Sequence, residues 1–212
     1  MYLTRRLFVG AGMAAALPAG AAVPDDRKLV FKVFRNGSAI GTHAVTFLPS
    51  GADLSVEIAV DLAVGFGPLT LYRYTLRGQE TWRRGVLMEA SAQGVDGGDK
   101  VWMRAARQNG ALMVEGSKAK RYAAPESSIV ASHWNRAEMA APMVNLQNGE
   151  LMDFSVQPKG SDTVQARGRA VPAAQFALTG PATLNLWYDQ ADVWTALRAI
   201  GEDGSTITYV QD

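Results

Sequence analysis

The stretch that decides the fold class is residues 54–64, Leu-Ser-Val-Glu-Ile-Ala-Val-Asp-Leu-Ala-Val. Large apolar side chains occupy every second position from Leu54 to Val64, and Glu57 and Asp61 fall between them. A period of two over such a stretch is typical of a β-strand with one face buried and the other in water. The sequence therefore predicts a long strand here, with its acidic face solvated.

Turn signals recur on both sides of this strand. Asn36-Gly37 separates residues 29–35 from residues 38–48, and an Asn-Gly pair between two apolar runs favours a tight hairpin turn. Later turns are expected at Asp96-Gly97-Gly98, Asn109-Gly110 and Asp203-Gly204, and further breaks at 49–51, 65–68 and 159–162. Turns spaced about 8–12 residues apart are typical of all-β proteins.

Residues 125–147 depart from this pattern, because they lack alternation and contain helix formers. Ser132 or Asn135 would cap a short helix over residues 136–141, which Pro142 would end. The whole pattern predicts a mainly β fold, an antiparallel meander that forms a curved sheet, half-barrel or barrel. One short helical or irregular segment near residues 125–147 interrupts it.

Residues 1–21 have the pattern of an export signal. Residues 4–10 read Thr-Arg-Arg-Leu-Phe-Val-Gly, and a short apolar stretch and a small-residue end follow them. The paired Arg5 and Arg6 match the twin-arginine export signal. The alternative is an ordinary secretory signal that contains two arginines by chance.

Cleavage is expected after Ala21 and leaves residues 22–212 as a single β-rich domain. The apolar stretch is far shorter than the roughly 20 residues that a membrane-spanning helix needs, so no transmembrane span is expected. The expected partner is the twin-arginine export machinery, which would read residues 4–10, and the expected location of the soluble protein is the periplasm.

The composition excludes several kinds of chemistry. The 212 residues include no cysteine, which removes disulfides, thiol nucleophiles, iron–sulfur ligation and a lipid-anchored cysteine. The formal net charge is +1. Without Arg5 and Arg6 the 21 basic residues fall to 19, against 20 acidic ones, so no nucleic-acid partner is expected.

Catalytic motifs are absent from the sequence. The two histidines, His43 and His133, lie far apart and in no metal-ligand spacing, so neither a metal nor another cofactor is expected. No Gly-x-Ser-x-Gly elbow and no phosphate-binding loop occurs. His133 and Ser132 remain the catalytic candidates, because a triad is recognised by geometry. On balance the sequence disfavours an enzyme.

Ser132-His133-Trp134-Asn135 is a dense polar and aromatic group in the irregular segment. Functional groups concentrate on loops that a rigid scaffold holds. His133 would then exchange protons or bind a ligand group, and Trp134 would form a pocket wall. In the structural alternative, Trp134 plugs one end of the barrel while His133 and Asn135 satisfy backbone groups.

Residues 71–121 form a basic stretch that includes Arg73 and Arg104. Arginines beside an aromatic side chain such as Trp102 would hold a phosphate or carboxylate through forked hydrogen bonds. In the alternative, the stretch is a solvated face balanced by acids on other strands. Aromatic side chains would line a ligand cavity or simply fill the core: Tyr72, Tyr74, Trp82, Trp102, Tyr122, Trp187, Tyr188 and Trp194.

A family resemblance covers nearly all of the chain after residue 21. The matching stretches are residues 34–47, 72–74 with 80–82, 132–135, 148–150, 168–173 and 186–189. They resemble domain-of-unknown-function family 6134, which comprises uncharacterised exported bacterial β-proteins. The order of elements is more weakly similar to other periplasmic families of unknown function with β half-barrels. The resemblance implies a fold and a compartment, and it implies no activity for any residue.

The leading hypothesis is a non-catalytic periplasmic β-barrel-like protein that binds an apolar or amphipathic small molecule or a lipid. The expected ligand-binding residues are Trp102, Trp134, Asn135, Trp187, Arg73, Arg104 and His133. The tryptophans would line the site, Arg73 or Arg104 would meet an acidic headgroup, and His133 would lie near the mouth. The alternatives are a small hydrolase or isomerase that uses His133, and an interaction or assembly module of the envelope.

Overall fold

The computed structural model of the protein describes residues 22–66 and 69–212. The expected signal at residues 1–21 lies outside the described residues, as do Gly67 and Pro68 of the expected break. Within the described residues, no helix is both long enough and apolar enough to cross a membrane.

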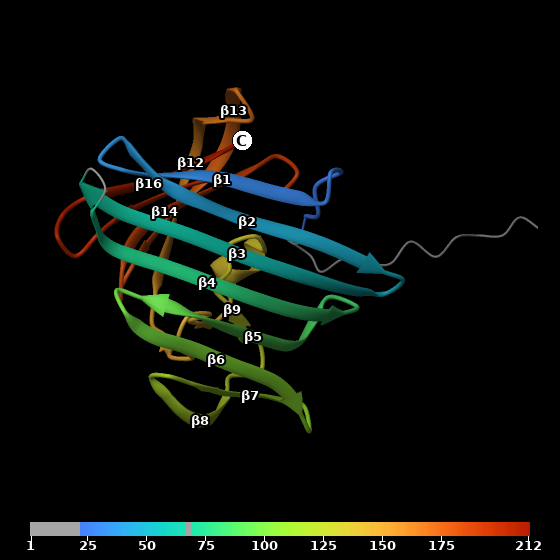
Figure 1. Ribbon diagram of the computed structural model, residues 1–212. Helices are drawn as coiled ribbons and strands as arrows, with labels where there is room; N and C mark the ends of the chain where they lie inside the picture. Colours follow the sequence, from blue (N-terminus) through green and yellow to red (C-terminus); the bar gives the residue numbers. More distant parts are fainter. Residues whose placement is uncertain (1–21, 67–68) are drawn as a thin grey trace, which may run out of the picture.

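Thirteen strands in the described part of the chain form one antiparallel sheet, in the order β12-β13-β14-β15-β16-β1-β2-β3-β4-β5-β6-β7-β8 (Figure 1). The first eight strands are β1 (Lys28–Arg35), β2 (Ser38–Ser50), β3 (Asp53–Phe66), β4 (Leu69–Arg83), β5 (Val86–Asp96), β6 (Asp99–Gln108), β7 (Ala111–Gly116) and β8 (Ala119–Ala124). The last five are β12 (Ser155–Ala166), β13 (Arg169–Thr179), β14 (Thr183–Asp189), β15 (Trp194–Ile200) and β16 (Thr206–Gln211).

The first and last strands along the chain, β1 and β16, are neighbours in this sheet. Strand β1 pairs with β16, with Phe31 opposite Gln211 and Arg35 opposite Ile207. Because β1 and β16 pair with each other, the two edges of the sheet are strands from the middle of the chain, β8 and β12. The curved sheet therefore stays open where the chain leaves it after residue 124.

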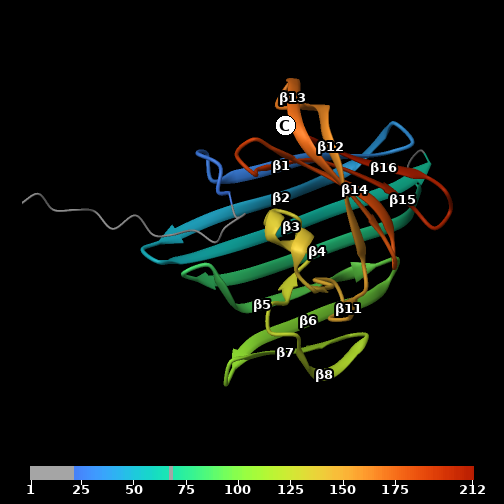
Figure 2. The same cartoon turned by 180° about the vertical axis from the view of Figure 1, so that it is seen from behind.

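The residues between the two edges fill the hollow of the sheet. This plug segment, residues 125–154, lies on the concave side of the sheet (Figure 2). It contains the short strands β9 (Ile129–Val130), β10 (Met143–Val144) and β11 (Leu151–Met152) and the 3-10 helix η1 (Arg136–Ala140). Strand β10 pairs with β9 in parallel and with β11 antiparallel.

Alternation along the strands creates the core. On β3, Leu54, Val56, Ile58 and Val60 are buried, and the acidic Glu57 and Asp61 are exposed, as the sequence predicts. The largest fully buried side chains come from both layers: Trp134 of the plug segment with Trp194, Tyr188, Phe31 and Phe47 of the sheet. Burial of this apolar surface, worth roughly 25 cal/mol per Å², holds the plug segment against the sheet.

Polar contacts also hold the plug segment to the rest of the structure. The Gln147 side-chain amide donates to Asp96 at 2.5 Å, and the Tyr122 hydroxyl donates to the Gly149 carbonyl at 2.9 Å. In η1, Arg136 forms an ion pair with Asp192, which lies in the turn between β14 and β15. The plug segment is therefore tied to β5 and β8 on one side and to the β14–β15 turn on the other.

The predicted fold class, an antiparallel meander in a curved sheet with one irregular segment, is confirmed. The predicted helix is a 3-10 helix, and Asn135 is its N-cap, since its side-chain oxygen accepts a hydrogen bond from the Ala137 N–H at 3.0 Å. The predicted loop at 159–162 is wrong, because these residues continue β12 past a bulge between Pro158 and Gly160. An edge strand tolerates proline and a bulge, since one side of it needs no ladder hydrogen bonds.

Candidate functional site

A cavity of about 220 Å³ lies between the concave face of the sheet and the plug segment. Its buried floor comes from the sheet and the plug segment together: His43, Ile58, Val60, Leu76, Ser132 and Leu146. Partly exposed side chains surround the floor, among them Tyr74, His133, Gln147, Phe154 and Tyr209. The lining is mostly apolar with a few polar groups, which is the usual makeup of a small-molecule site.

His43 and Ser132 are buried polar residues that line this cavity. The alternation of β2 turns His43, Val45 and Phe47 inward, and only 6% of the His43 surface is exposed. Burial, together with the nearby His133, lowers the pKa of His43 to about 3, so its ring stays neutral. Its Nε2 atom has no hydrogen-bond partner among the described residues.

Aromatic rings pack around the His43 ring. The ring centroids of Trp194 and Tyr209 lie 5.3 Å and 5.7 Å from that of His43, both edge to face. The Phe31 ring lies 6.2 Å away in a similar orientation. Packing of this kind fixes the direction of the imidazole before any ligand binds.

His133 lines the same cavity and has a buried carboxylate partner. Its Nδ1 atom lies 2.8 Å from Oε1 of Glu138, and its backbone N–H donates to the other oxygen of Glu138 at 3.1 Å. The Tyr188 hydroxyl donates to the His133 carbonyl at 2.9 Å. These bonds stabilise the positive φ of 68° at His133. The contact with Glu138 engages Nδ1, and Nε2 is the other ring nitrogen of His133.

A second buried carboxyl ties the plug segment to the sheet beside this cavity. One oxygen of Glu80, on β4, accepts the indole N–H groups of Trp82 at 2.7 Å and of Trp134 at 3.0 Å. Burial raises the pKa of Glu80 to about 7, although hydrogen bonds from Ser132 and the two indoles oppose the rise. Trp134 is therefore a structural anchor for the segment that carries His133.

The titratable side chains in the described lining of the cavity are histidines and tyrosines. Within the described residues, no lysine, arginine, aspartate or glutamate lines it. Nor do the described residues include a group of three or more histidine, aspartate or glutamate side chains that could hold a metal ion. The chemistry that the cavity offers is thus hydrogen bonding and proton transfer by imidazole.

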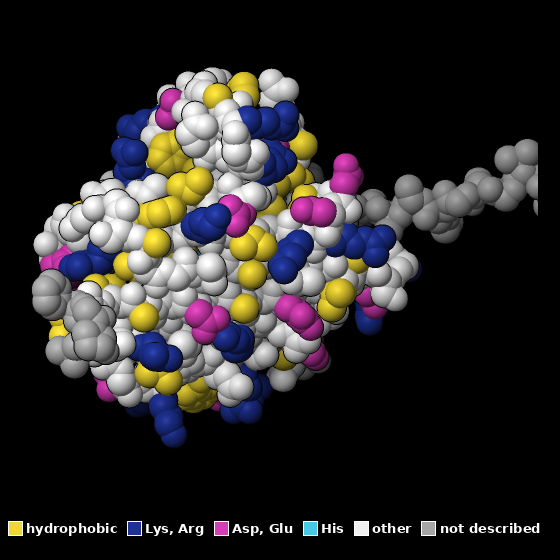
Figure 3. All heavy atoms as spheres, turned by 45° about the horizontal axis from the view of Figure 1, so that its top comes forward, with side chains coloured by type: hydrophobic (Ala, Val, Ile, Leu, Met, Phe, Trp, Pro, Cys, Tyr) yellow, Lys and Arg dark blue, Asp and Glu magenta, His cyan; other side chains and the backbone are white. Residues whose placement is uncertain are grey.

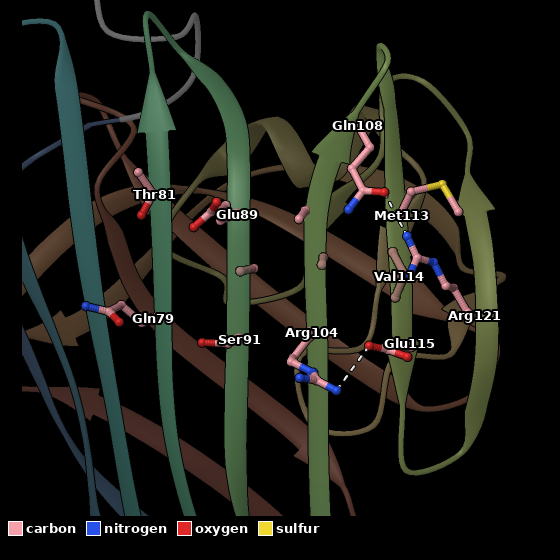
Figure 4. A pocket seen from close by; sticks show the side chains of 13 residues that line it. Gln79, Thr81, Glu89, Ser91, Arg104, Gln108, Met113, Val114, Glu115 and Arg121 are labelled. Carbon is pink, nitrogen blue, oxygen red and sulfur yellow. Dashed lines mark hydrogen bonds and ion pairs between the residues drawn. The ribbon is translucent and has the colours of Figure 1, made fainter.

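Trp102 and Arg104 lie outside this cavity, on the outer face of β6. They line a shallow hollow of about 750 Å³, and Arg104 also lines a neighbouring one of about 300 Å³ (Figure 4). The Arg104 guanidinium stacks on the Trp102 ring at 5.4 Å and pairs with Glu115 at 3.2 Å. These contacts already engage the two side chains.

Other arginines on the outer face also form ion pairs with acidic side chains. Arg77 pairs with Asp61 at 2.8 Å, and Arg83 with Asp53 at 3.1 Å, from the neighbouring strand in each case. Figure 3 shows basic and acidic side chains interspersed on the face it presents. The basic stretch of the sequence therefore forms no single patch of positive charge there.

The structure does not bring the predicted ligand-binding residues together. Trp187 is buried in a small separate cluster with Ala173 and Ala196, and its indole N–H donates to Asp162 at 3.1 Å. Arg73 is exposed. Of the candidates, His133 and Ser132 line the interior cavity, while Trp134 and Asn135 lie within the plug segment.

Sequence reasoning missed three residues near the cavity, His43, Glu80 and Glu138. His43 carried a signal, because it stands in phase with the inward Val45 and Phe47. Glu138 lies five residues after His133, but the turn that joins the two side chains needs a positive φ at a histidine. Nothing in the sequence pairs Glu80 with Trp134, which lies 54 positions later.

The open, barrel-like antiparallel sheet is similar to the fold of a protein of known structure. A similar one is the crystal structure of a beta-barrel-like protein of domain of unknown function DUF1849 from Brucella abortus, with a TM-score of 0.59 and 9% sequence identity. The similarity covers 87% of this chain and 94% of the Brucella chain, and at this identity it concerns the fold alone. Residues 31–212 match the domain of unknown function DUF6134, and the chain belongs to this family. No curated protein matches the sequence.

Proposed function

We propose that the protein is a non-catalytic binder of an apolar or amphipathic small molecule, which it holds in the interior cavity. The observation that carries this proposal is the mostly apolar cavity between the sheet and the plug segment, which has two imidazoles among its lining residues. A cavity with an apolar lining and a few polar groups is the usual form of a small-molecule site.

The construction of the cavity supports a binding role. The aromatic rings around His43 and the carboxylate on His133 orient both imidazoles in advance, so a ligand need not order them. Partly exposed side chains at Gln147, Met152 and Phe154 border the cavity on the plug side, where a ligand would enter.

The test of binding is a cavity-filling variant. Ala131→Phe places a ring in the cavity, whereas the matched control Ala63→Phe adds the same ring at an exposed position of β3. Protein purified from its native compartment is extracted, and the extract is analysed by mass spectrometry. We expect a stoichiometric small molecule with the wild type and the control and none with Ala131→Phe. Equal extracts from both variants, or a ligand-free wild type, would contradict the proposal.

Export to the periplasm is part of the same proposal. The pattern of residues 4–10 supports the twin-arginine route, since Arg5 and Arg6 stand together ahead of a short apolar stretch. Replacing both arginines by lysine should leave the precursor in the cytoplasm, and cell fractionation measures this. Export that survives this change but stops when the general secretory route is blocked would favour the ordinary secretory signal.

A second candidate function is proton-transfer catalysis at His133. The observation that favours it is the 2.8 Å contact between Nδ1 and the buried Glu138, which leaves Nε2 of His133 as a base beside the cavity. In that case the compound recovered from His133→Gln protein would be the substrate, and wild-type protein would convert it. If wild-type protein returns the compound unchanged, the protein is a binder only.

A further inference from the structure

We propose that the ligand is a long-chain compound, whose hydrocarbon chain extends from the interior cavity into an apolar groove beside it. This inference rests on the proposed binding function and names the chemical class of the ligand. Three observations carry it: the small volume of the cavity, the apolar lining of the groove, and two side chains that line both of them.

The groove, which we call the plug groove, has a volume of about 490 Å³. Its walls come from η1, β10 and β11 of the plug segment and from the start of β12 (Figure 2). Asp153 is the exception in a described lining that is otherwise apolar. The large apolar side chains of the lining are Met139, Met143, Leu151, Met152, Phe154 and Val156. Leu151 is 47% exposed, and exposed apolar surface of this kind is typical of a ligand-binding groove or a protein interface.

Met152 and Phe154 connect the plug groove to the interior cavity, because both side chains line both of them. These two residues and Val156 occupy alternate positions from β11 into β12, and all three pack against the main core while staying partly exposed. A methionine side chain is flexible and adapts to the group that it contacts. A chain that fills the cavity can therefore continue past Met152 into the plug groove and remain in apolar surroundings.

The volume of the cavity favours a ligand that continues into the plug groove. An apolar cavity of about 150 Å³ holds benzene, which has six carbons. In the same proportion, the interior cavity of about 220 Å³ takes about nine carbons, and the plug groove offers more than twice that volume. A compact ligand would fill the cavity and leave the plug groove in contact with water. A longer chain covers both and gains affinity with each further methylene group that it buries.

The lining favours a hydrocarbon chain over a docked protein segment. A protein segment brings backbone N–H and carbonyl groups, which need hydrogen-bond partners when they are buried. Asp153 is the single charged or amide side chain in the described lining of the plug groove. A hydrocarbon chain needs no such partner, so it suits this lining.

Primary alcohols of increasing length test the inference on purified wild-type protein that refolding from urea has freed of bound ligand. The probes are 1-hexanol, 1-octanol, 1-decanol and 1-dodecanol. By titration calorimetry the affinity should rise about tenfold with each added pair of methylene groups, through to 1-dodecanol. Binding in the cavity alone would stop gaining affinity at about nine carbons. Equal affinities for 1-decanol and 1-dodecanol would therefore overturn the inference and leave the binding function standing.

The methyl resonances of two methionines report where the chain lies. Met139 lines the plug groove alone, whereas Met152 lines the plug groove and the cavity. We expect 1-hexanol to shift the Met152 resonance only and 1-dodecanol to shift both resonances. If 1-dodecanol leaves Met139 unchanged, or 1-hexanol shifts it equally, no chain spans the cavity and the plug groove, and the inference fails.

Leu151→Arg tests the plug groove, and Leu48→Arg is its matched control. The two leucines are 47% and 48% exposed, and Leu48 lines neither the plug groove nor the cavity. Leu151→Arg should weaken the binding of 1-dodecanol at least about tenfold and leave that of 1-hexanol unchanged, while the control matches the wild type. Unchanged 1-dodecanol binding in Leu151→Arg would overturn the inference. So would a wild-type dimer that Leu151→Arg dissociates, since a second copy would then cover the plug groove.

The native extract separates this inference from the proposed binding function. We expect mass spectrometry to find a chain longer than about nine carbons, in a free fatty compound or a complete lipid, and to find none with Ala131→Phe. A compact compound instead would overturn the inference and leave binding standing. An empty extract from the wild type, together with no binding of any alcohol, would overturn both. So would 1-dodecanol binding that Ala131→Phe leaves unchanged, because the chain would then lie outside the cavity.

Discussion

Two buried titratable side chains, Glu80 and His43, carry pKa shifts of opposite sign for the same physical reason. Burial disfavours the charged form of each, which raises the pKa of the acid to about 7 and lowers the pKa of the base to about 3. Folding therefore makes Glu80 take up a proton and His43 release one. The stability of the protein must depend on pH through both residues.

The pH dependence of these two residues should cancel over a definite range. Between about 4.5 and 6.5, folded Glu80 is protonated while unfolded Glu80 is not, so its contribution falls as pH rises. In the same range unfolded His43 is protonated while folded His43 is not, so its contribution rises with pH. The wild type should thus show little net slope from this pair. As the pH falls below about 4.5, the wild type should lose stability, because unfolded His43 still binds a proton that folded His43 does not.

Replacement of either residue should reveal the pH dependence of stability that the other residue contributes. In Glu80→Gln, which keeps an oxygen for the two indoles, stability should rise by about 1.4 kcal/mol per pH unit between pH 4.5 and 6.5. In His43→Phe the slope should have the opposite sign and similar size. Urea unfolding followed by tryptophan fluorescence measures both. A Glu80→Gln variant with an unchanged pH profile would show that Glu80 is ionised in the folded protein throughout this range.

At the scale of the element, close approach between the plug segment and the sheet depends on glycines. Gly116 ends β7, and a Cβ built there would lie 2.1 Å from the Asn148 carbonyl oxygen and 2.9 Å from the Trp102 carbonyl oxygen. Both are backbone atoms, so no side chain can move aside. The backbone of the plug segment can approach the end of β7 at Gly116 because a side chain is absent there, and the Lys118 N–H donates to the same Asn148 carbonyl at 3.2 Å.

Gly116→Ala should therefore destabilise the protein by about 2–4 kcal/mol, because plug and sheet must separate to admit the methyl group. Gly110→Ala is the matched control. Its Cβ meets no atom within 4 Å, so it should cost only the strain of its positive φ, about 1 kcal/mol. Thermal or urea unfolding of the two variants measures the difference. Equal losses would mean that the plug segment moves easily at this contact.

At the scale of the whole molecule, the pairing of β1 with β16 decides where the sheet opens. The Asp212 N–H donates to the Val30 carbonyl at 2.8 Å, and its side chain pairs with Lys32 at 2.7 Å. The two ends of the described chain are thus held together by the sheet. The opening, with the plug segment behind it, falls in the middle of the sequence.

A circular permutant tests this arrangement. A short Gly/Ser linker from residue 212 to residue 22, with new ends between Asn109 and Gly110, cuts an exposed hairpin and keeps every strand pair. Its free energy of unfolding should lie within about 1 kcal/mol of the parent. The same linker with new ends between residues 136 and 137 cuts η1 and should abolish cooperative unfolding. If the second permutant is as stable as the first, the plug segment does not support the sheet.

The fold could be predicted from the sequence where the signals are local. The alternation at residues 54–64 and the Asn-Gly turns specify long antiparallel hairpins, and Asn135 marks the start of η1. The pairing of β1 with β16 left no local signal, because it joins residues about 180 positions apart. The sheet stays open because β8 and β12, its two edge strands, are not paired with each other.

The candidate site was harder to predict from the sequence, because its residues are far apart in the sequence and meet only in the folded structure. The phase of alternation would have placed Trp102 outside, since it stands between the inward Val101 and Met103. The phase also separates Trp187 from the main core, since Leu184, Leu186 and Tyr188 pack in that core and Trp187 lies in a cluster of its own. The carboxyl partners of Trp134 and His133 come from folding of the plug segment, which has no periodic pattern to follow.

The pairing of β1 with β16 also bears on the synthesis of the protein. While the ribosome makes the chain, β1 has its later neighbour β2 almost at once, but its other edge waits until residues 206–211 emerge. An unpaired strand edge invites association with other chains. Any chain that stops early exposes this edge permanently, so incomplete products of translation should be the aggregation-prone species of this protein.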